Sequence, residues 1–215
     1  MRYFITGTDT GIGKTFVLSL IIKYLISKGV KPYVMKPIET GCINQGGKLV
    51  PEDAQSLAKI TGLEDRLDDV CPYRFELPLA PYVASRLEKR EISVDKIKEV
   101  SEKFGEPLFV EGAGGLMVPV LKNFFMVDLA KYLGLEVIFI APLRLGTINH
   151  TLLSIEAMEK RGVAIKGIIM NDTDGIETVA TKTNPEVLTE LQPHKLIGVV
   201  PFKAEALPVS LNFNL

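Results

Sequence analysis

The stretch Gly7-Thr8-Asp9-Thr10-Gly11-Ile12-Gly13-Lys14-Thr15 lies between a short apolar run, Tyr3-Phe4-Ile5, and an amphipathic segment that extends to Ser27. Phosphate is negatively charged and needs several N–H donors at once, which a glycine-rich turn at a helix N-terminus supplies. Lys14 can reach the outer phosphates of a nucleotide, and the Thr15 hydroxyl can hold Mg²⁺. The order of strand, glycine-rich turn, Gly-Lys-Thr and helix therefore predicts a phosphate-binding loop (P-loop).

The spacing of this loop is a variant, because five residues rather than the usual four separate Gly7 from Gly13. The alternative is an ordinary strand-to-helix turn with an exposed lysine. The elements on both sides of the turn favour the P-loop.

Beyond the loop, short β-branched or aromatic runs alternate with segments of helical periodicity. Further strands are predicted at residues 33–35, 108–110, 137–140, 168–170 and 197–200, and further helices at residues 52–60, 81–87, 93–104, 127–133 and 147–160. The uniformly apolar run 137–140 is typical of a strand that is covered on both faces. We therefore expect an α/β fold of the P-loop NTPase type, with a mostly parallel sheet flanked by helices. The length of 215 residues suggests a single domain, residues 1–215.

The composition excludes several classes of protein. Lys and Arg total 25 against 26 Asp and Glu, so the basic excess of a nucleic-acid-binding protein is absent. The apolar runs are shorter than the ~20 residues that span a bilayer. The N-terminal apolar run turns polar at Thr6, too early for a signal peptide. The two cysteines, Cys42 and Cys71, are expected to be free thiols, which suits a reducing compartment. We therefore expect a cytoplasmic protein without nucleic-acid or membrane partners.

Further groups of residues narrow the function. In chain order they are Lys36-Pro37-Ile38-Glu39-Thr40-Gly41, Asp53, Glu111-Gly112-Ala113-Gly114-Gly115, Gly146-Thr147-Ile148-Asn149-His150 and Asn171-Asp172. Together with Gly7-Thr8-Asp9-Thr10, this ordered set resembles the dethiobiotin synthase family from Thr6 to about Pro201. The resemblance implies a homodimer that uses ATP, Mg²⁺ and CO₂ to convert 7,8-diaminopelargonic acid to dethiobiotin. One amine forms a carbamate, ATP phosphorylates the carbamate to a mixed anhydride, and the second amine closes a cyclic urea.

Two lysines are the candidate catalytic residues. A carbamate that attacks a γ-phosphate brings two anions together, so cations must offset their repulsion. Lys14 supplies one positive charge. Lys36 follows the second predicted strand, and ligands of open α/β sheets bind at such strand ends. We expect this strand end to lie beside the P-loop, and the resemblance implies that Lys36 contacts the carbamate and the transferring phosphate. An isolated lysine at a strand end would more simply be solvated.

Thr15, Asp53 and Glu111 are the candidate Mg²⁺ ligands, because Mg²⁺ prefers hard oxygen donors. Glu111 directly follows a predicted strand, the position of a Walker-B-type acid. Asp53 lies near a predicted helix start, where helix capping is the alternative role. Its metal role depends on the resemblance.

The resemblance also assigns the remaining contacts. The expected nucleotide-binding residues are Thr10, Gly11, Ile12, Gly13, Lys14, Thr15, Phe16, Asp53, Glu111, Gly112, Ala113, Gly114, Asn171, Asp172, Pro201, Phe202 and Lys203. The amide of Asn171 offers the donor and the acceptor that an adenine edge requires. The expected substrate-binding residues are Thr10, Thr40, Gly146, Thr147, Ile148 and Asn149. The last four open a helix whose N–H groups can bind a carboxylate, and the resemblance places them at the dimer interface, against the substrate of the partner subunit.

Three other functions are possible. Partitioning ATPases with a deviant P-loop carry a signature lysine early in the loop, where this chain has Asp9-Thr10-Gly11. Cobyrinate-type amide synthetases have a similar chemistry but normally carry a glutaminase domain, for which 215 residues leave no room. A small-molecule kinase would consume ATP without any dependence on CO₂. The ordered motifs favour the dethiobiotin synthase family over all three.

Overall fold

The computed structural model describes residues 1–194 and 196–208, so the tail beyond residue 208 lies outside the described residues. Its central sheet has six parallel strands in the order β12-β11-β10-β1-β7-β2. These strands are β1 (Arg2–Gly7), β2 (Tyr33–Met35), β7 (Leu108–Glu111), β10 (Glu136–Pro142), β11 (Ile165–Asn171) and β12 (Leu196–Val200). The prediction of an α/β fold with a parallel sheet is confirmed.

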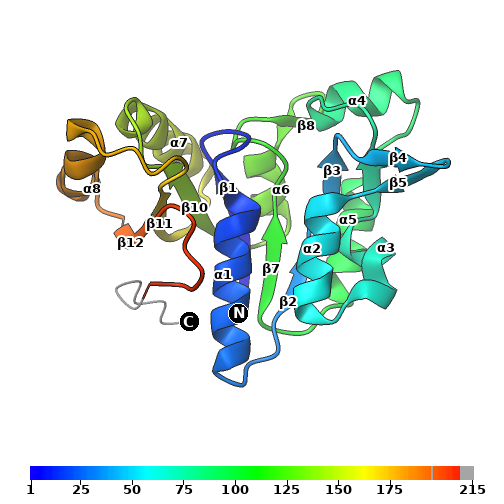
Figure 1. The fold of residues 1–215 in the computed structure, drawn as a ribbon. Coiled ribbons are helices and arrows are strands. Elements are labelled where there is room, and N and C mark those ends of the chain that lie inside the picture. The colour runs from blue at the N-terminus through cyan, green and yellow to red at the C-terminus, as the bar shows by residue number, and fades with distance from the viewer. Residues whose placement is uncertain (195, 209–215) are drawn as a thin grey trace.

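Helices cover both faces of the sheet. They are α1 (Lys14–Ser27), α2 (Glu52–Thr61), α3 (Leu67–Val70), α4 (Pro81–Leu87), α5 (Val94–Glu102), α6 (Met126–Tyr132), α7 (Thr147–Arg161) and α8 (Val179–Leu191), with a 3₁₀ turn at Glu64–Arg66. Figure 1 shows α1 and α2 in front of the sheet and α6 and α7 behind it. Phe4, Phe109 and Phe139 on three neighbouring strands are completely buried, as expected for a sheet with two covered faces.

Several short elements were not predicted from the sequence. Two three-residue strands, β3 (Ile38–Thr40) and β6 (Tyr73–Phe75), form a small parallel pair. Two antiparallel hairpins consist of β4 (Ile43–Gln45) with β5 (Lys48–Val50), and of β8 (Pro119–Leu121) with β9 (Phe124–Phe125). Helix α8 also lacked a clear signal, since Pro185 lies inside it and proline normally interrupts a helix.

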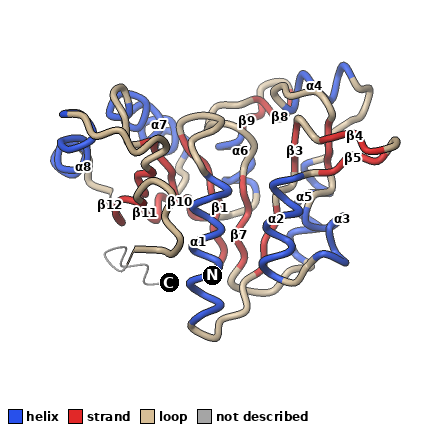
Figure 2. The backbone as a smooth tube through the Cα atoms, viewed as in Figure 1, coloured by secondary structure: helices blue, strands red, loops and turns tan. Residues whose placement is uncertain are grey.

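The strand order decides which side chains meet. The loop that joins β1 to α1 lies at the upper edge of the sheet in Figure 2. Because all strands are parallel, the ends of β2 and β7 lie at the same edge. Strand β7 separates β1 from β2, so Lys36 is one strand further from the P-loop strand than the sequence predicts, and its direct neighbour is the end of β7. No helix in residues 1–194 and 196–208 is long and apolar enough to cross a bilayer.

Candidate active site

The P-loop wraps tightly over the start of α1. Gly13 precedes the helix with a φ of 85°, in the left-handed region that favours glycine. A Cβ atom at this position would lie 2.3 Å from Nδ2 of Asn171, so there is no room for a side chain. Lys14 is buried, and its Nζ donates a hydrogen bond of 2.7 Å to the carbonyl of Asp9 within the loop. Burial lowers the pKa of Lys14 to about 8, although the nearby Glu111 opposes this shift.

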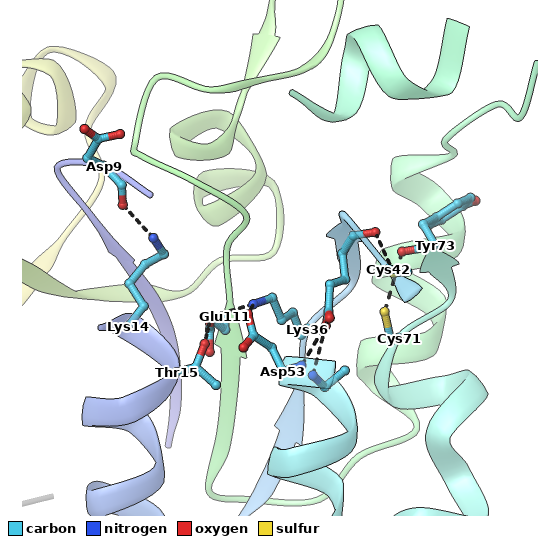
Figure 3. A network of polar contacts seen from close by, with 11 residues as sticks. Asp9, Lys14, Thr15, Lys36, Cys42, Asp53, Cys71, Tyr73 and Glu111 are labelled. Atoms are coloured by element: carbon cyan, nitrogen blue, oxygen red, sulfur yellow. Dashed lines mark hydrogen bonds and ion pairs between the residues drawn. The ribbon is translucent and has the colours of Figure 1, made fainter. Parts of the chain in front are cut away.

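A buried network joins the ends of β2 and β7 to the start of α2, as Figure 3 shows. Lys36 follows β2, and its Nζ contacts both the carboxylate of Asp53 and, at 2.9 Å, Oε1 of Glu111. The same Oε1 accepts a hydrogen bond of 2.7 Å from the Thr15 hydroxyl. Contacts thus join Lys36 to all three candidate metal ligands, and Lys14 lines the same cavity as these residues.

The electrostatics of Lys36 explain how a lysine can be buried here. Lys36 is only 6% exposed and Glu111 only 1% exposed. An unpaired buried charge is costly, so a buried lysine normally pairs or loses its proton. Burial alone would lower the pKa of Lys36, but the attraction of Glu111 and Asp53 outweighs it, and the pKa is raised. Lys36 thus carries a fixed positive charge beside the P-loop cavity, which rules out the solvated lysine that an isolated residue would suggest.

The oxygen atoms around Lys36 fit a divalent cation. Among the described residues, no hydrogen-bond donor reaches Oε2 of Glu111, although this atom is buried. The carboxylate of Asp53 is about half exposed toward the cavity, with 49% of its side chain accessible. One hydroxyl and two carboxylates are the hard donors that Mg²⁺ prefers. Thr15, Asp53 and Glu111 could therefore hold Mg²⁺.

A cavity of about 840 Å³ lies against this network. Of the predicted site residues, those that line it are Thr10, Gly11, Gly13, Lys14, Thr15, Phe16, Lys36, Thr40, Asp53, Glu111, Ala113 and Gly114. The segment 78–81, with the sequence Pro-Leu-Ala-Pro, forms an apolar part of the wall together with Val118. The cavity therefore joins a charged end, suited to phosphates, to an apolar wall.

The residues predicted to contact the base lie apart from this cavity. Asn171 ends β11 under the P-loop, where its Nδ2 donates a hydrogen bond of 2.9 Å to the carbonyl of Ile12. Its buried Oδ1 has no partner among the described residues, which leaves the acceptor of the amide available. Asp172 begins the adjoining turn by accepting hydrogen bonds from the N–H groups of Asp174 and Gly175. Gly175 packs against the ring of Phe202.

The helix start at residues 146–149 also lies outside the cavity. Helix α7 begins at Thr147, as the sequence predicts, and the residue before it, Gly146, provides no side-chain cap. None of the described residues that line the cavity belongs to this segment. The neighbouring Leu145 is 86% exposed. Within one chain, this candidate carboxylate-binding segment is therefore separated from the lysines.

One residue of the site was missed in the sequence. Glu39 lines the cavity and is 7% exposed, and burial raises its pKa. It lies in the motif that begins at Lys36, but no role was assigned to it. Because Glu and Asp are seldom buried without a partner, only the three-dimensional structure, which places Glu39 in hydrogen-bond contact with the start of α2, shows that this glutamate belongs to the site.

The fold and the site define a class of protein. A P-loop at the end of β1, an acid at the end of β7 and a buried lysine between two carboxylates are the parts of an enzyme that transfers or hydrolyses a nucleotide phosphoryl group. The fold agrees with those of solved P-loop ATPases. The chain superimposes on the MinC:MinD cell division protein complex of Aquifex aeolicus with a TM-score of 0.56 at 16% identity, covering 94% of this chain and 81% of that one. A ParA family ATPase from Chlorobium tepidum gives a TM-score of 0.55 at 12% identity, covering 95% and 85%.

Sequence comparison identifies the family within this class. A family model described as an AAA domain matches residues 1–208. The ATP-dependent dethiobiotin synthetase BioD of Thermodesulfovibrio yellowstonii is 44% identical over 214 residues, covering 94% of this chain and 89% of that protein. The protein of the same name from Aquifex aeolicus is 40% identical over 207 residues, covering 94% and 88%. The chain belongs to the ATP-dependent dethiobiotin synthetase family.

Proposed function

We propose that this chain is an ATP-dependent dethiobiotin synthetase, which converts 7,8-diaminopelargonic acid, CO₂ and ATP to dethiobiotin, ADP and phosphate in biotin biosynthesis. The observation that carries this proposal is the buried ammonium of Lys36 between Glu111 and Asp53, beside the P-loop and facing a cavity with an apolar wall. Family membership agrees with it.

The chemistry consists of three bond-forming steps. An amine nitrogen of the substrate attacks the carbon of CO₂ and loses a proton, which gives a carbamate. A carbamate oxygen then takes the γ-phosphoryl group from ATP, with release of ADP. The second amine attacks the carbonyl carbon of this mixed anhydride and loses a proton, inorganic phosphate leaves with the C–O bond electrons, and the cyclic urea of dethiobiotin is complete.

The residues fit the second step, in which two anions approach each other. The loop N–H groups and Lys14 are proposed to hold the phosphates. Lys36 is proposed to offset the charge of the carbamate and of the moving phosphoryl group, because its ammonium is already held at the strand ends. Mg²⁺, held by Thr15, Asp53 and Glu111, would neutralise phosphate charge when bound.

The cavity also fits the remaining parts of the reactants. Thr10 and Thr40 line it and are proposed to hydrogen-bond the carbamate or the amine on which it forms. The apolar segment 78–81 is proposed to contact the aliphatic chain. The proposed base-binding group consists of Asn171, Asp172, Pro201, Phe202 and Lys203. The two free, buried cysteines suit a reducing compartment, so we place the enzyme in the cytoplasm.

We also propose a homodimer with shared active sites. The helix start 146–149 does not line the cavity of its own chain, yet its N–H groups suit a carboxylate such as that of the substrate. An exposed apolar side chain lies beside each of these two regions: Leu145 is next to the helix start, and Leu79 lines the cavity. A second copy that brings the helix start to the cavity would cover both.

The test of the activity is release of ADP with diaminopelargonic acid, with and without bicarbonate, together with detection of dethiobiotin by mass spectrometry. We expect ADP and dethiobiotin in equal amounts, and both only with bicarbonate. Release of ADP that does not depend on bicarbonate would instead favour a kinase or a partitioning ATPase.

The test of the shared site is subunit complementation. Asn149→Asp adds a negative charge where the substrate carboxylate is proposed to bind, and a helix start tolerates this charge. Lys36→Gln is the second variant, and each variant alone should be strongly impaired. Mixing the two should restore about a quarter of wild-type activity, because half of the random dimers hold one intact site. If subunit exchange is demonstrated and the mixture still gains no activity, each active site lies within one chain.

A further inference from the structure

The N-terminus of α2 is capped by a side chain from another element. The residue that precedes the helix, Pro51, has no side-chain hydrogen bond to it. Instead, the carboxylate of Glu39 on β3 accepts hydrogen bonds from two backbone N–H groups in the first turn of α2. Oε1 accepts from the N–H of Asp53 at 3.1 Å, and Oε2 accepts from the N–H of Ala54 at 2.9 Å. Both oxygens of Glu39 are therefore engaged by the turn that carries a candidate metal ligand.

The burial of Glu39 shows that this contact is specific. A buried carboxylate is costly unless hydrogen bonds and opposite charge compensate it. Here the two N–H donors, the positive end of the α2 dipole and the nearby Lys36 provide that compensation. A glutamine at this position would keep the shape, but its NH₂ group would face one of the two N–H donors. Only a carboxylate satisfies both.

The contact has a consequence for Asp53. Glu39 holds its backbone N–H, and Lys36 holds its carboxylate. About half of the Asp53 side chain is exposed, so side-chain packing contributes little to its position. Glu111, by contrast, is part of β7 and is held by the sheet. Of the two carboxylates, Asp53 thus depends on a cap from outside its own helix.

We propose that Glu39 is a positioning residue, which fixes the first turn of α2 so that Asp53 presents its carboxylate to Mg²⁺. Glu39 itself binds neither the metal nor the substrate. The inference rests on the proposed function only in that Asp53 is taken as a Mg²⁺ ligand. It adds a residue that the motifs of the site had left without a role.

The experiment compares Glu39→Gln with Glu52→Gln in the full-length chain. Glu52 is exposed and lies in the same first turn of α2, so its variant removes an equal charge from the same helix end. The first readout is Mn²⁺ binding in the presence of ADP, followed by electron paramagnetic resonance of free Mn²⁺. The second is the Mg²⁺ concentration that gives half-maximal turnover, and the third is the thermal midpoint.

We expect Glu39→Gln to weaken Mn²⁺ binding and to raise the half-maximal Mg²⁺ concentration by about 10- to 100-fold, the usual effect of removing an outer partner of a metal ligand. Turnover at saturating Mg²⁺ should recover most of the wild-type value, and Glu52→Gln should match the wild type throughout. The proposal is overturned if the Mn²⁺ dissociation constant of Glu39→Gln lies within twofold of that of Glu52→Gln. A lowered thermal midpoint with unchanged Mn²⁺ binding would show that Glu39 is only a structural cap of the helix.

A second variant and a readout that needs no turnover separate the role of Glu39 from a folding failure and from a failure of the proposed function. If Glu39→Gln does not fold, Glu39→Asp is measured by the same criterion, since it keeps the charge but is too short to reach both N–H groups. Mn²⁺ binding needs no turnover. If the wild type binds Mn²⁺ with ADP but forms no dethiobiotin, the proposed function fails while the role of Glu39 is still decided.

Discussion

The proposed phosphate end of the site and its proposed base end are built in different ways. At the phosphate end, Lys36 and Glu111 are buried, directly bonded to each other, and placed at the ends of adjacent strands. At the base end, Phe202 is 40% exposed and the neighbouring turn is held by an Asx-type contact at Asp172. The first end is organised by the core, and the second by local turns on the surface.

This difference bears on catalysis. Charged groups that are fixed before the reaction stabilise charge in the transition state without the cost of reorganisation. Lys36 and Glu111 meet that condition because both side chains are buried and paired with each other. The exposed end proposed to bind the base is suited to affinity and selectivity, which require contacts with the ligand rather than a fixed electrostatic field. Substitutions at the two ends should therefore affect different kinetic constants, and by different amounts.

The largest effect is expected for Lys14→Ala. This change removes the proposed phosphate cation, and the loss of such a group costs on the order of 3 kcal/mol in the transition state, or about a hundredfold in turnover. Steady-state ADP release at saturating ATP measures it. Lys23→Ala, on the exposed side of the same helix, is the control and should be silent. Near-wild-type turnover of Lys14→Ala would mean that the loop does not act on phosphate.

Lys36→Gln should come next, with an effect mainly on kcat. The loop and Lys14 still hold the nucleotide, so the KM for ATP should change little, while kcat falls by about tenfold to a hundredfold as transition-state stabilisation is lost. Steady-state kinetics with diaminopelargonic acid and saturating bicarbonate separate the two constants. Lys31→Gln, exposed just before the same strand, is the matched control. A kcat within about twofold of the wild type would exclude Lys36 from the mechanism.

The same contrast explains what could be predicted from the sequence. The P-loop and Glu111 were predictable because their signals are local: a strand, then glycines or an acid directly after it. The pairing of Lys36 with Asp53 depends on how α2 packs beside β2, and no spacing in the chain encodes that distance. Glu39 was missed for the same reason. The strands β3 and β6 escaped prediction since three residues carry too little periodicity.

A third, smaller effect concerns pH. Burial holds the pKa of Lys14 at about 8, below its ordinary 10.5, so most of these side chains are neutral at pH 9. Phosphate favours the charged form and should restore the proton. Nucleotide affinity should therefore fall by at most about tenfold per pH unit above 8, with proton uptake on binding.

Calorimetry at pH 9 in two buffers of different ionisation enthalpy detects this proton uptake. Lys14→Arg keeps its charge at this pH and should show equal heats in both buffers. Equal heats for the wild type as well would indicate that Lys14 is already protonated before the nucleotide binds.

The smallest effect is expected at the exposed base end. The ring of Phe202 lies against Gly175, and the ammonium of Lys203 lies 5.0 Å from its centroid. If this ring contacts the base, Phe202→Ala removes an aromatic contact of about 0.5–1.5 kcal/mol, which raises the KM for ATP by about twofold to tenfold and leaves kcat unchanged. Leu191→Ala, another exposed apolar residue, is the control. A reduced kcat at unchanged KM would mean that this exposed ring acts on the transition state rather than on binding. Phe202 would then belong to the chemistry of the phosphate end, and the proposed separation of the two ends would be wrong.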